Sequence, residues 1–528
     1  MISSLKNHDL EKNPWPIAFA VGIAVFMVVL DTSVANVSLP YIAGNLSASI
    51  DESTWVLTSF LVANAIVLPL GGYFAGIFGR KRFYMFGIFS FTLASVLCGL
   101  APSLNWLIIF RIFQGMGGGI LQPTSQAILV ESFPHEQRGM AMAMMGISTV
   151  FAPIIGPVLG GWITENYSWH WIFFINIVPG ILSLVLVSML VKDPPNFRLI
   201  SKEKGFRFDY MGIGMLTLGL AALEFALDEG HRLDWFESKL IIFSFIIGII
   251  ALVMVVFHEL RLKNPVIDLR LCKDRNFSIS MFMLYVLGFA LYGSLSLLPI
   301  FLQTMLGYSA ITSGWVLSPG GMIILFMMPV VALLMKKVDN RILIAVGYFF
   351  TGLGLFWMSR FNLEVDYTTT MLARVLQCFG LAFLFVPINV MAFQNVPPEK
   401  IGYASGLLNL VRNYGGSTGI ALITTLLARR AQLHQVYLAG NLTPSSIPLR
   451  NFLHKGQALM ASHGYAPVDA LQRAHKMVYG SLLRQSSMIA FADVFYGIGI
   501  LCFISIPLLF LIKIDKKPGN AESMMIAE

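Results

Sequence analysis

The stretch WPIAFAVGIAVFMVVLDTSVANVSLP, residues 15–40, is a long apolar run with one carboxylate, Asp31, inside it. About 20 apolar residues are enough for a helix to cross the hydrocarbon core of a bilayer, which is about 30 Å thick. A charged side chain at the middle of such a helix opposes insertion by about 2.5–3.5 kcal/mol. Asp31 is therefore a candidate functional group inside a membrane.

The composition of the whole chain is that of a membrane protein. Of its 528 residues, 56% are hydrophobic and 12% charged, whereas about 25% of the residues of a soluble protein are charged. The net charge of +8 indicates basic cytoplasmic loops and not nucleic-acid binding. The four cysteines have no metal-type spacing and are expected to be free thiols. We predict an all-α membrane protein without a metal or cofactor.

The loops alternate in charge. The segments 79–82, 192–207, 261–275, 336–341 and 513–517 are basic, whereas 39–53, 101–105, 164–168 and 228–238 contain almost no Lys or Arg. By the positive-inside rule, both termini lie in the cytoplasm. Fourteen transmembrane helices are predicted, over residues 15–37, 54–75, 83–101, 105–129, 139–163, 169–190, 209–227, 239–258, 277–302, 311–335, 342–360, 367–394, 401–428 and 489–513.

The segment 429–487 is a long loop on the outer side that contains several Arg and Lys residues. Long loops cross the membrane largely regardless of charge, so this loop does not contradict the orientation. Its part VDALQRAHKMVYGSLLRQS, residues 468–486, has the pattern of an amphipathic helix. We expect an extracytoplasmic subdomain here and not a linker.

The chain contains an internal duplication. RIFQG (111–115) matches RVLQC (374–378), and FPHEQRGMA (133–141) matches VPPEKIGYA (396–404), both at an offset of 263 residues. The first six and the last six helices are thus predicted to be homologous halves, 1–192 and 276–528, around an inserted helix pair in 193–275. Two six-helix halves with a site between them at mid-depth form a transporter architecture.

Four motifs point to a family: LDTSVANVSLP (30–40), RIFQGMGGG (111–119), GISTVFAPIIGPVLGG (146–161) and WHWIFFINIVPG (169–180). With them the sequence resembles the fourteen-helix drug:proton antiporter branch of the major facilitator superfamily and is similar to EmrB-type multidrug exporters. The resemblance covers essentially the whole chain. It implies proton-driven export of amphipathic drugs from a Gram-negative inner membrane, together with a periplasmic adaptor and an outer-membrane channel. The alternative is a stand-alone pump whose long loop caps the cavity.

One motif departs from the superfamily pattern. GYFAGIFGRKR (72–82) stands where the superfamily carries a gating loop with an acidic residue four positions after its first glycine, and here that position is Gly76. The acidic latch on the cytoplasmic side is therefore expected to be absent or replaced. Gly72, Gly79, Arg80 and Lys81 of the gating loop remain.

Asp31 and Arg111 are the predicted proton-coupling residues. Asp31 lies about 24 Å along its helix and Arg111 about 9 Å inside its own, which enters from the opposite side, so both are in the outer half of the membrane. We expect them to be neighbours that face the cavity between the halves, with Asp31 as proton carrier and Arg111 adjusting its proton affinity. The alternative is a static ion pair that fixes helix packing. Arg374 mirrors Arg111, but the span 277–302 offers it no acid.

Other polar residues within the spans have more than one interpretation. Glu224 and Asp228 share one face of the seventh helix. Asp228 is expected to be solvated, and Glu224 to be a second proton or cation site or merely a helix-end residue. Arg412 is expected to bind an anionic substrate or to pair with a carboxylate. The further candidates for lining the cavity are amides, namely Asn36, Asn64, Gln114, Gln122, Gln126, Gln377, Asn389 and Asn409.

Small residues and prolines mark the fifth helix. Small residues allow helices to approach closely, and proline kinks a helix. In an antiporter such a surface would seal the two halves against proton leakage, and ordinary close packing is the alternative. The residues concerned are Gly146, Pro153, Gly156, Pro157, Gly160 and Gly161.

Three other functional classes are compatible with a membrane protein of this kind to different degrees. An exporter of one metabolite, such as a fatty acid or a siderophore, would share all these motifs. A membrane enzyme is disfavoured, because the sequence has no Walker loop, no HExxH motif and no cluster of histidines. A receptor without transport activity would not need Asp31 and Arg111.

Overall fold

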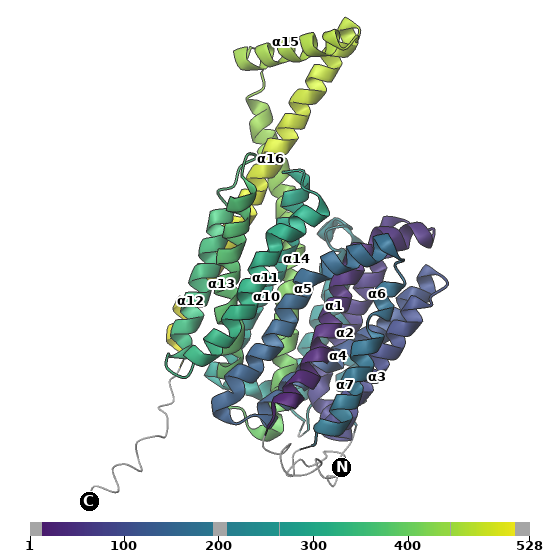
Figure 1. Ribbon diagram of the computed structural model, residues 1–528, viewed down its shortest axis with the longest axis vertical. Coiled ribbons are helices and arrows are strands. Elements are labelled where there is room, and N and C mark those ends of the chain that lie inside the picture. Colours follow the sequence, from purple (N-terminus) through teal and green to yellow (C-terminus); the bar gives the residue numbers. More distant parts are fainter. Residues whose placement is uncertain (1–12, 194–207, 263, 444, 513–528) are drawn as a thin grey trace, which may run out of the picture.

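A computed structural model describes residues 13–193, 208–262, 264–443 and 445–512, and in these ranges the chain is helical apart from short connections. Figure 1 shows two helical bundles side by side and an arm that projects from one end. The predicted all-α membrane fold is confirmed. We call the end of the bundle that carries the arm the arm end, and the opposite end, where α1 begins, the terminal end.

We call residues 15–190 the first half. They contain α1 (Trp15–Asn45), α2 (Ile50–Phe78), α3 (Arg80–Gly99), α4 (Leu104–Ser132), the short helix η1 (His135–Gln137), α5 (Arg138–Asn166), α6 (Trp171–Phe174) and α7 (Ile177–Leu190). Next along the chain come α8 (Tyr210–Glu229) and α9 (Lys239–Glu259), which correspond to the predicted inserted pair.

We call residues 275–505 the second half. They contain α10 (Arg275–Thr304), α11 (Ala310–Leu334), α12 (Asn340–Met358), α13 (Tyr367–Ala392), α14 (Ile401–Gly440), α15 (Ile447–Ser462) and α16 (Pro467–Ser505).

Polar caps mark where several helices begin. At α2, the Ser49 side chain accepts a hydrogen bond from the Glu52 backbone, and the Glu52 carboxylate accepts one from the Ser49 backbone. Such a capping box satisfies two backbone donors that the first helical turn leaves without partners. Asp209, Asp274 and Asp366 cap α8, α10 and α13 in a simpler way. These caps set the ends of helices whose interiors are almost wholly apolar.

Twelve helices in the described ranges are long and apolar enough to cross a membrane, or thirteen if the bent α5 is one span. The remaining predicted span, 401–428, is the first part of α14, which packs on α2, α10 and α16. It contains Arg412 and several other polar residues, which lower its hydropathy. The chain is therefore a multi-pass membrane protein, and the prediction of about fourteen spans agrees with it.

The same helix contacts recur in both halves. In the first half α1 packs on α5, and α4 packs on α2 and α3. In the second half α10 packs on α14, and α13 packs on α11 and α12. The halves meet where α5 packs on α11 and where α2 packs on α14. The inserted α8 contacts α2 and α14, one helix from each half.

Three predicted helices have different limits in the structure. The predicted span 169–190 is divided into α6 and α7, with a break at Ile175 and Asn176. α14 and α16 continue past the predicted spans into the arm, where α15 packs on α16 (Figure 1). The stretch 468–486 is helical, as predicted, but it is the start of the last membrane helix and not a separate element.

Candidate functional site

Asp31 is buried in α1, with 1% of its surface exposed. Arg111 Nη1 lies 2.5 Å from its Oδ2 atom. The Oδ1 atom accepts hydrogen bonds from Gln114 Nε2 at 2.8 Å and from Asn176 Nδ2 at 2.7 Å. One cation and two amide donors thus surround the carboxylate, which is the environment that an ionised carboxylate needs away from water.

Arg111 is itself fixed by α2. Its Nε atom donates to the Val56 carbonyl at 2.9 Å, and its guanidinium carbon lies 4.2 Å from the centroid of the Phe60 ring. The helices approach closely here because α4 carries Gly115, where any side chain would collide with the Phe60 carbonyl. The guanidinium is therefore held between α1 and α2.

The expected contact between Asp31 and Arg111 is present, but the expectation that both face the space between the halves is wrong. Their hydrogen-bond partners come from α1, α2, α4 and the break between α6 and α7, all in the first half. Depth along a helix follows from the sequence, whereas the direction of a side chain around the helix axis depends on packing. The pair lies inside the first half.

Asn176 and Ser95 belong to the same network and were not predicted. Asn176 Nδ2 lies 3.0 Å from Ser95 Oγ, which donates to the Phe173 carbonyl at 2.8 Å. The break between α6 and α7 is what brings Asn176 toward Asp31. The signal in the sequence was an amide within the apolar part of the motif WHWIFFINIVPG.

The second half repeats the arrangement without the acid. Arg374 Nη1 contacts Ser294 Oγ at 3.2 Å, and Gln377 Nε2 donates to the same oxygen at 2.7 Å. Ser294 follows Asp31 by 263 residues, and Arg374 follows Arg111 by the same number. A hydroxyl therefore stands where the first half has a carboxylate, and the Nε atom of the buried Arg374 has no hydrogen-bond partner in the described part of the chain.

A polar cluster joins the two halves. Gln126 of α4 contacts Asn389 of α13, and its Oε1 atom accepts hydrogen bonds from Ser405 at 3.0 Å and Asn409 at 2.5 Å, both on α14. Gln126 and Asn389 are 263 residues apart, which is the offset of the predicted repeat. Ser405 also donates to the Pro123 carbonyl at 2.6 Å. Ser405 was not predicted.

Arg412 extends this cluster. Its Nη2 atom donates to Gln122 of α4 at 3.0 Å and to Asn409 at 2.8 Å, and it is 2% exposed. Its guanidinium lies 5.5 Å from the ring of Phe385. Its Nε atom has no partner, and no carboxylate of the described residues forms an ion pair with it. The predicted candidates Gln122, Gln126, Asn389, Asn409 and Arg412 thus form one connected group.

The other predicted amides lie elsewhere. Gln114 and Gln377 are inside the halves, beside the two buried arginines. Asn36 is exposed on α1. Asn64 is 8% exposed on α2, where its Nδ2 atom lies close to Gly118 of α4.

Two glycines of the fifth helix pack within the first half. A side chain at Gly156 would collide with Ser33, and one at Gly160 would lie 2.9 Å from Val34, both on α1. Ser33 Oγ donates to the Pro153 carbonyl at 3.2 Å. The α5 bend of 44° places its two segments, Arg138–Pro153 and Ile155–Asn166, along α1. A seal between the halves is therefore not formed by these two glycines.

Gly146 of the same helix does face the second half. A side chain there would lie 2.7 Å from Phe385 and 2.8 Å from Met328. Gly161 has open space around it, and Pro157 lies inside the helix. The motif thus serves two contacts, one with α1 and one across the halves.

The gating loop closes the terminal end through backbone. A side chain at Gly72 would lie 2.6 Å from the backbone atoms of Gly402 and Tyr403. Two glycines, one from each half, thus meet in the loop for which the sequence predicted that the acidic latch of the superfamily is absent or replaced. In this structure the two halves are in direct backbone contact at this position.

The basic residues of the gating loop bind within the first half. Gly79 ends α2 with a φ of 91°, a conformation that glycine adopts readily. Arg80 is buried and forms an ion pair with Glu131 of α4. The backbone N–H of Lys81 donates to Asp193 at 2.9 Å. These contacts fix the loop to the end of α4 and α7.

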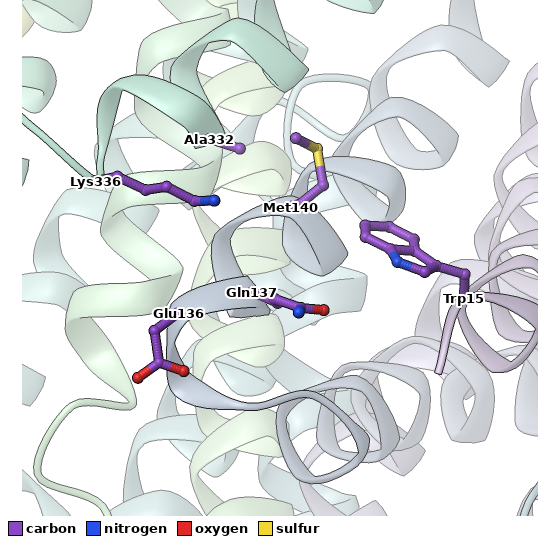
Figure 2. Close-up of a pocket in the computed structure, with 6 residues that line it drawn as sticks. All are labelled: Trp15, Glu136, Gln137, Met140, Ala332 and Lys336. Atoms are coloured by element: carbon purple, nitrogen blue, oxygen red, sulfur yellow. The ribbon is translucent and has the colours of Figure 1, made fainter. Parts of the chain in front are cut away.

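A cavity of about 210 Å³ opens at the terminal end, between α1, η1, α5 and α11 (Figure 2). It combines an aromatic ring, a thioether and one charge of each sign, but contains none of the polar residues that the sequence predicted for substrate contact. Its lining residues are Trp15, Glu136, Gln137, Met140, Ala332 and Lys336.

The chain matches the model of the Major Facilitator Superfamily over residues 21–420. It is 35% identical to the fatty acid resistance protein FarB of Neisseria gonorrhoeae, over 94% of this chain and 96% of that protein. It is 36% identical to the multidrug export protein EmrB of Haemophilus influenzae, over 83% and 85% of the two chains. A solved structure of a double-tryptophan mutant of XylE aligns with a TM-score of 0.62 at 14% identity, over 97% and 99% of the chains.

Proposed function

The chain belongs to the major facilitator superfamily and is a transporter rather than an enzyme, and from this we propose that it is a proton-driven antiporter that exports amphipathic toxic compounds. The observation that carries the proposal is the buried carboxylate Asp31 with its three donors. A titratable group inside a membrane helix is expensive and marks function by default.

The proposed cycle begins with Asp31 ionised, as its donors favour. A proton that enters from outside neutralises the carboxylate and removes its attraction for Arg111. The guanidinium then needs other partners, and the packing of α4 against α1 and α2 changes. Release of the proton toward the cytoplasm restores the ion pair and resets the cycle. Rocking of the two halves supplies the alternating access.

In this scheme, α4 couples proton binding to substrate binding. Arg111, Gln122 and Gln126 are on one helix, and Gln122 lies about 16 Å from Arg111 along it. The proton site is within the first half, whereas the polar cluster of Gln122, Gln126, Asn389, Asn409 and Arg412 lies between the halves. We propose that the substrate binds to these cluster residues once they separate, together with nearby Met and Phe side chains, which adapt to varied ligands.

Efflux from whole cells tests the proposal. The chain is expressed in a bacterial strain that lacks its major drug pumps, with ethidium as the probe. We expect less ethidium in these cells than in cells with an empty vector, and loss of that difference when an uncoupler abolishes the proton gradient. Equal accumulation with and without the chain, over a panel of amphipathic compounds, would refute the export function.

We further propose that the chain is the inner-membrane part of a tripartite pump. The support is the arm, in which α14, α15 and α16 extend beyond the bundle (Figure 1). The arm exposes many apolar side chains, and exposed apolar patches of this kind mark interaction surfaces. They include Val436, Tyr437, Ile447, Leu459 and Val468.

Deletion of residues 440–480 tests the role of the arm. If a periplasmic adaptor and, through it, an outer-membrane channel bind here, the deletion abolishes co-purification of the adaptor but leaves exchange in vesicles intact. If the arm merely caps a stand-alone pump, the deletion changes exchange by the purified protein and no adaptor is lost.

A second candidate function is export of one anionic metabolite such as a fatty acid. The observation that favours it is Arg412, a buried cation between the halves without an acidic partner in the described chain. The similarity to a fatty acid resistance protein supports it as well. Growth in the presence of a long-chain fatty acid, compared with ethidium resistance, separates the two. An Arg412→Gln variant that loses only fatty acid resistance would identify the anionic substrate class.

We propose the inner membrane as the location, with both termini in the cytoplasm and the arm outside. The basic segments 79–82 and 336–341, at the terminal end, support this orientation. Labelling of single cysteines from outside intact cells tests the orientation.

We also propose that the chain consists of two duplicated halves and an inserted pair, because the helix contacts recur and Gln126 meets Asn389.

A further inference from the structure

Glu224 lies in α8 of the inserted pair and is 4% exposed. Its Oε1 atom accepts a hydrogen bond from Ser417 Oγ of α14 at 2.5 Å. Its Oε2 atom is buried and has no hydrogen-bond partner among the described residues. Within the described chain no Lys, Arg or His forms an ion pair with it. The single hydroxyl of Ser417 is thus its sole polar contact in the structure described.

The helix around Glu224 joins the two halves near the arm end. Asp228, one turn further along α8, accepts a hydrogen bond from Thr58 of α2. Phe225 stacks on Trp55 of α2, with 5.8 Å between the ring centroids. Glu224 therefore contacts the second half while its neighbours on α8 contact the first half.

Few titratable groups face Glu224. On its own helix the nearest is Asp228, and on α14 it is Tyr414, whose hydroxyl donates to the Leu220 carbonyl at 2.9 Å. Arg412 of α14 is bound to Gln122 and Asn409. Residues 53–72 of α2 and 240–257 of α9 contain no titratable side chain. Among the described residues, no cation thus compensates an ionised Glu224.

Burial of an ionised carboxylate without a counter-charge is costly, and such a group becomes neutral by binding a proton. Asp31 differs, since a guanidinium and two amides stabilise its charge. From this contrast we propose that Glu224 is a proton-binding site distinct from Asp31, occupied when the halves are joined through α8 as in this structure.

The proton comes from water at the arm end, near the end of α8, and adds to the free Oε2 atom. When the halves move apart at this end, Ser417 leaves Glu224, water reaches the carboxylate, and the proton returns to that water. Proton binding therefore favours the joined conformation, and acidity outside stabilises it. The proposal does not depend on proton-driven exchange, because this proton returns to the side from which it came.

Spin labels report the conformation at the arm end. The exposed ends of α5 and α11 are labelled through Glu165→Cys and Ile311→Cys, in a protein whose exposed Cys272 is replaced by Ser. Distances between the labels are measured by pulsed electron spin resonance in lipid nanodiscs as a function of pH. The wild type is expected to favour the short distance as the pH falls, by at most about tenfold in population ratio per pH unit for a single proton.

Two substitutions at Glu224 decide the case. Glu224→Gln, which is permanently neutral, is expected to keep the short distance at every pH, whereas Glu224→Asp is expected to keep the pH dependence.

In infrared spectra at neutral pH, Glu224→Gln should lose a protonated-carboxyl C=O band that Asp31→Asn retains. A pH dependence unchanged in Glu224→Gln, or an infrared band unaffected by it, would overturn the proposal. Absence of proton-driven exchange in the wild type would refute the proposed function but not this site.

Discussion

Asp31 and Ser294 occupy equivalent places in the two halves, and the difference between them decides how each neighbouring arginine contributes to stability. Arg111 neutralises a buried carboxylate, and its removal leaves that charge unpaired. Arg374 contacts a hydroxyl and an amide, so its removal leaves no buried charge. A variant of Arg374 in the second half therefore serves as a control for the same substitution at Arg111 in the first half.

We expect Arg111→Gln to lower the free energy of unfolding by about 3–5 kcal/mol, the usual cost of breaking a buried ion pair on one side. Arg374→Gln should cost distinctly less. The thermal midpoints of both variants in detergent, measured beside Asp31→Asn/Arg111→Gln, provide the comparison. Equal losses for the two single variants would mean that the Asp31 charge does not matter for stability.

The sequence predicted that Asp31 and Arg111 are neighbours, because the depth of each residue in the membrane follows from its position along its helix. It missed Asn176, since that side chain reaches Asp31 only through the break between α6 and α7. It also placed the pair in the space between the halves, because the pattern of residues around Asp31 did not fix the rotation of α1. Contacts that depend on helix rotation and on breaks in helices need the structure.

At the scale of elements, α1 and α5 are held together by the small residues of the fifth-helix motif. Gly156 lies against Ser33, whereas Gly161, in the same motif, has free space around it. Substitutions at these two positions therefore distinguish the effect of close packing on stability from the effect of helix propensity alone.

Gly156→Ala should destabilise the protein by about 1–3 kcal/mol, because its methyl group would force α1 and α5 apart. Gly161→Ala should be neutral or slightly stabilising, since alanine favours the helix. Thermal unfolding and exchange activity are measured for both variants. If Gly161→Ala were the more damaging of the two, the packing role assigned to Gly156 would be wrong.

At the scale of the whole molecule, the terminal end is closed. Backbone contact at Gly72 and Gly402, and the cluster around Gln126, join the halves there. The internal repeat predicted two halves, but not that amides at equivalent positions would meet. Which of several polar residues contact each other across two bodies depends on how the bodies are oriented, and sequence periodicity carries no such information.

Replacing Gln126 and Asn389 by leucine removes the polar contacts that hold the halves in this arrangement. We expect Gln126→Leu/Asn389→Leu to increase the population in which the terminal end is open. Spin labels at Glu136→Cys and Lys336→Cys, residues of the first and the second half that both line the cavity in Figure 2, report this as a longer distance. Gln377→Leu, a change within the second half, serves as the control and should leave the distance unchanged.

The central claim is that Asp31 carries the exchanged proton. The most direct test uses purified protein in vesicles that contain a pH-sensitive dye, with ethidium supplied on one side, and compares the wild type with Asp31→Asn and Arg374→Gln. We expect ethidium to drive proton movement in the wild type and in Arg374→Gln, and we expect Asp31→Asn to abolish it. Proton movement at the wild-type rate in Asp31→Asn would show that Asp31 does not carry the exchanged proton.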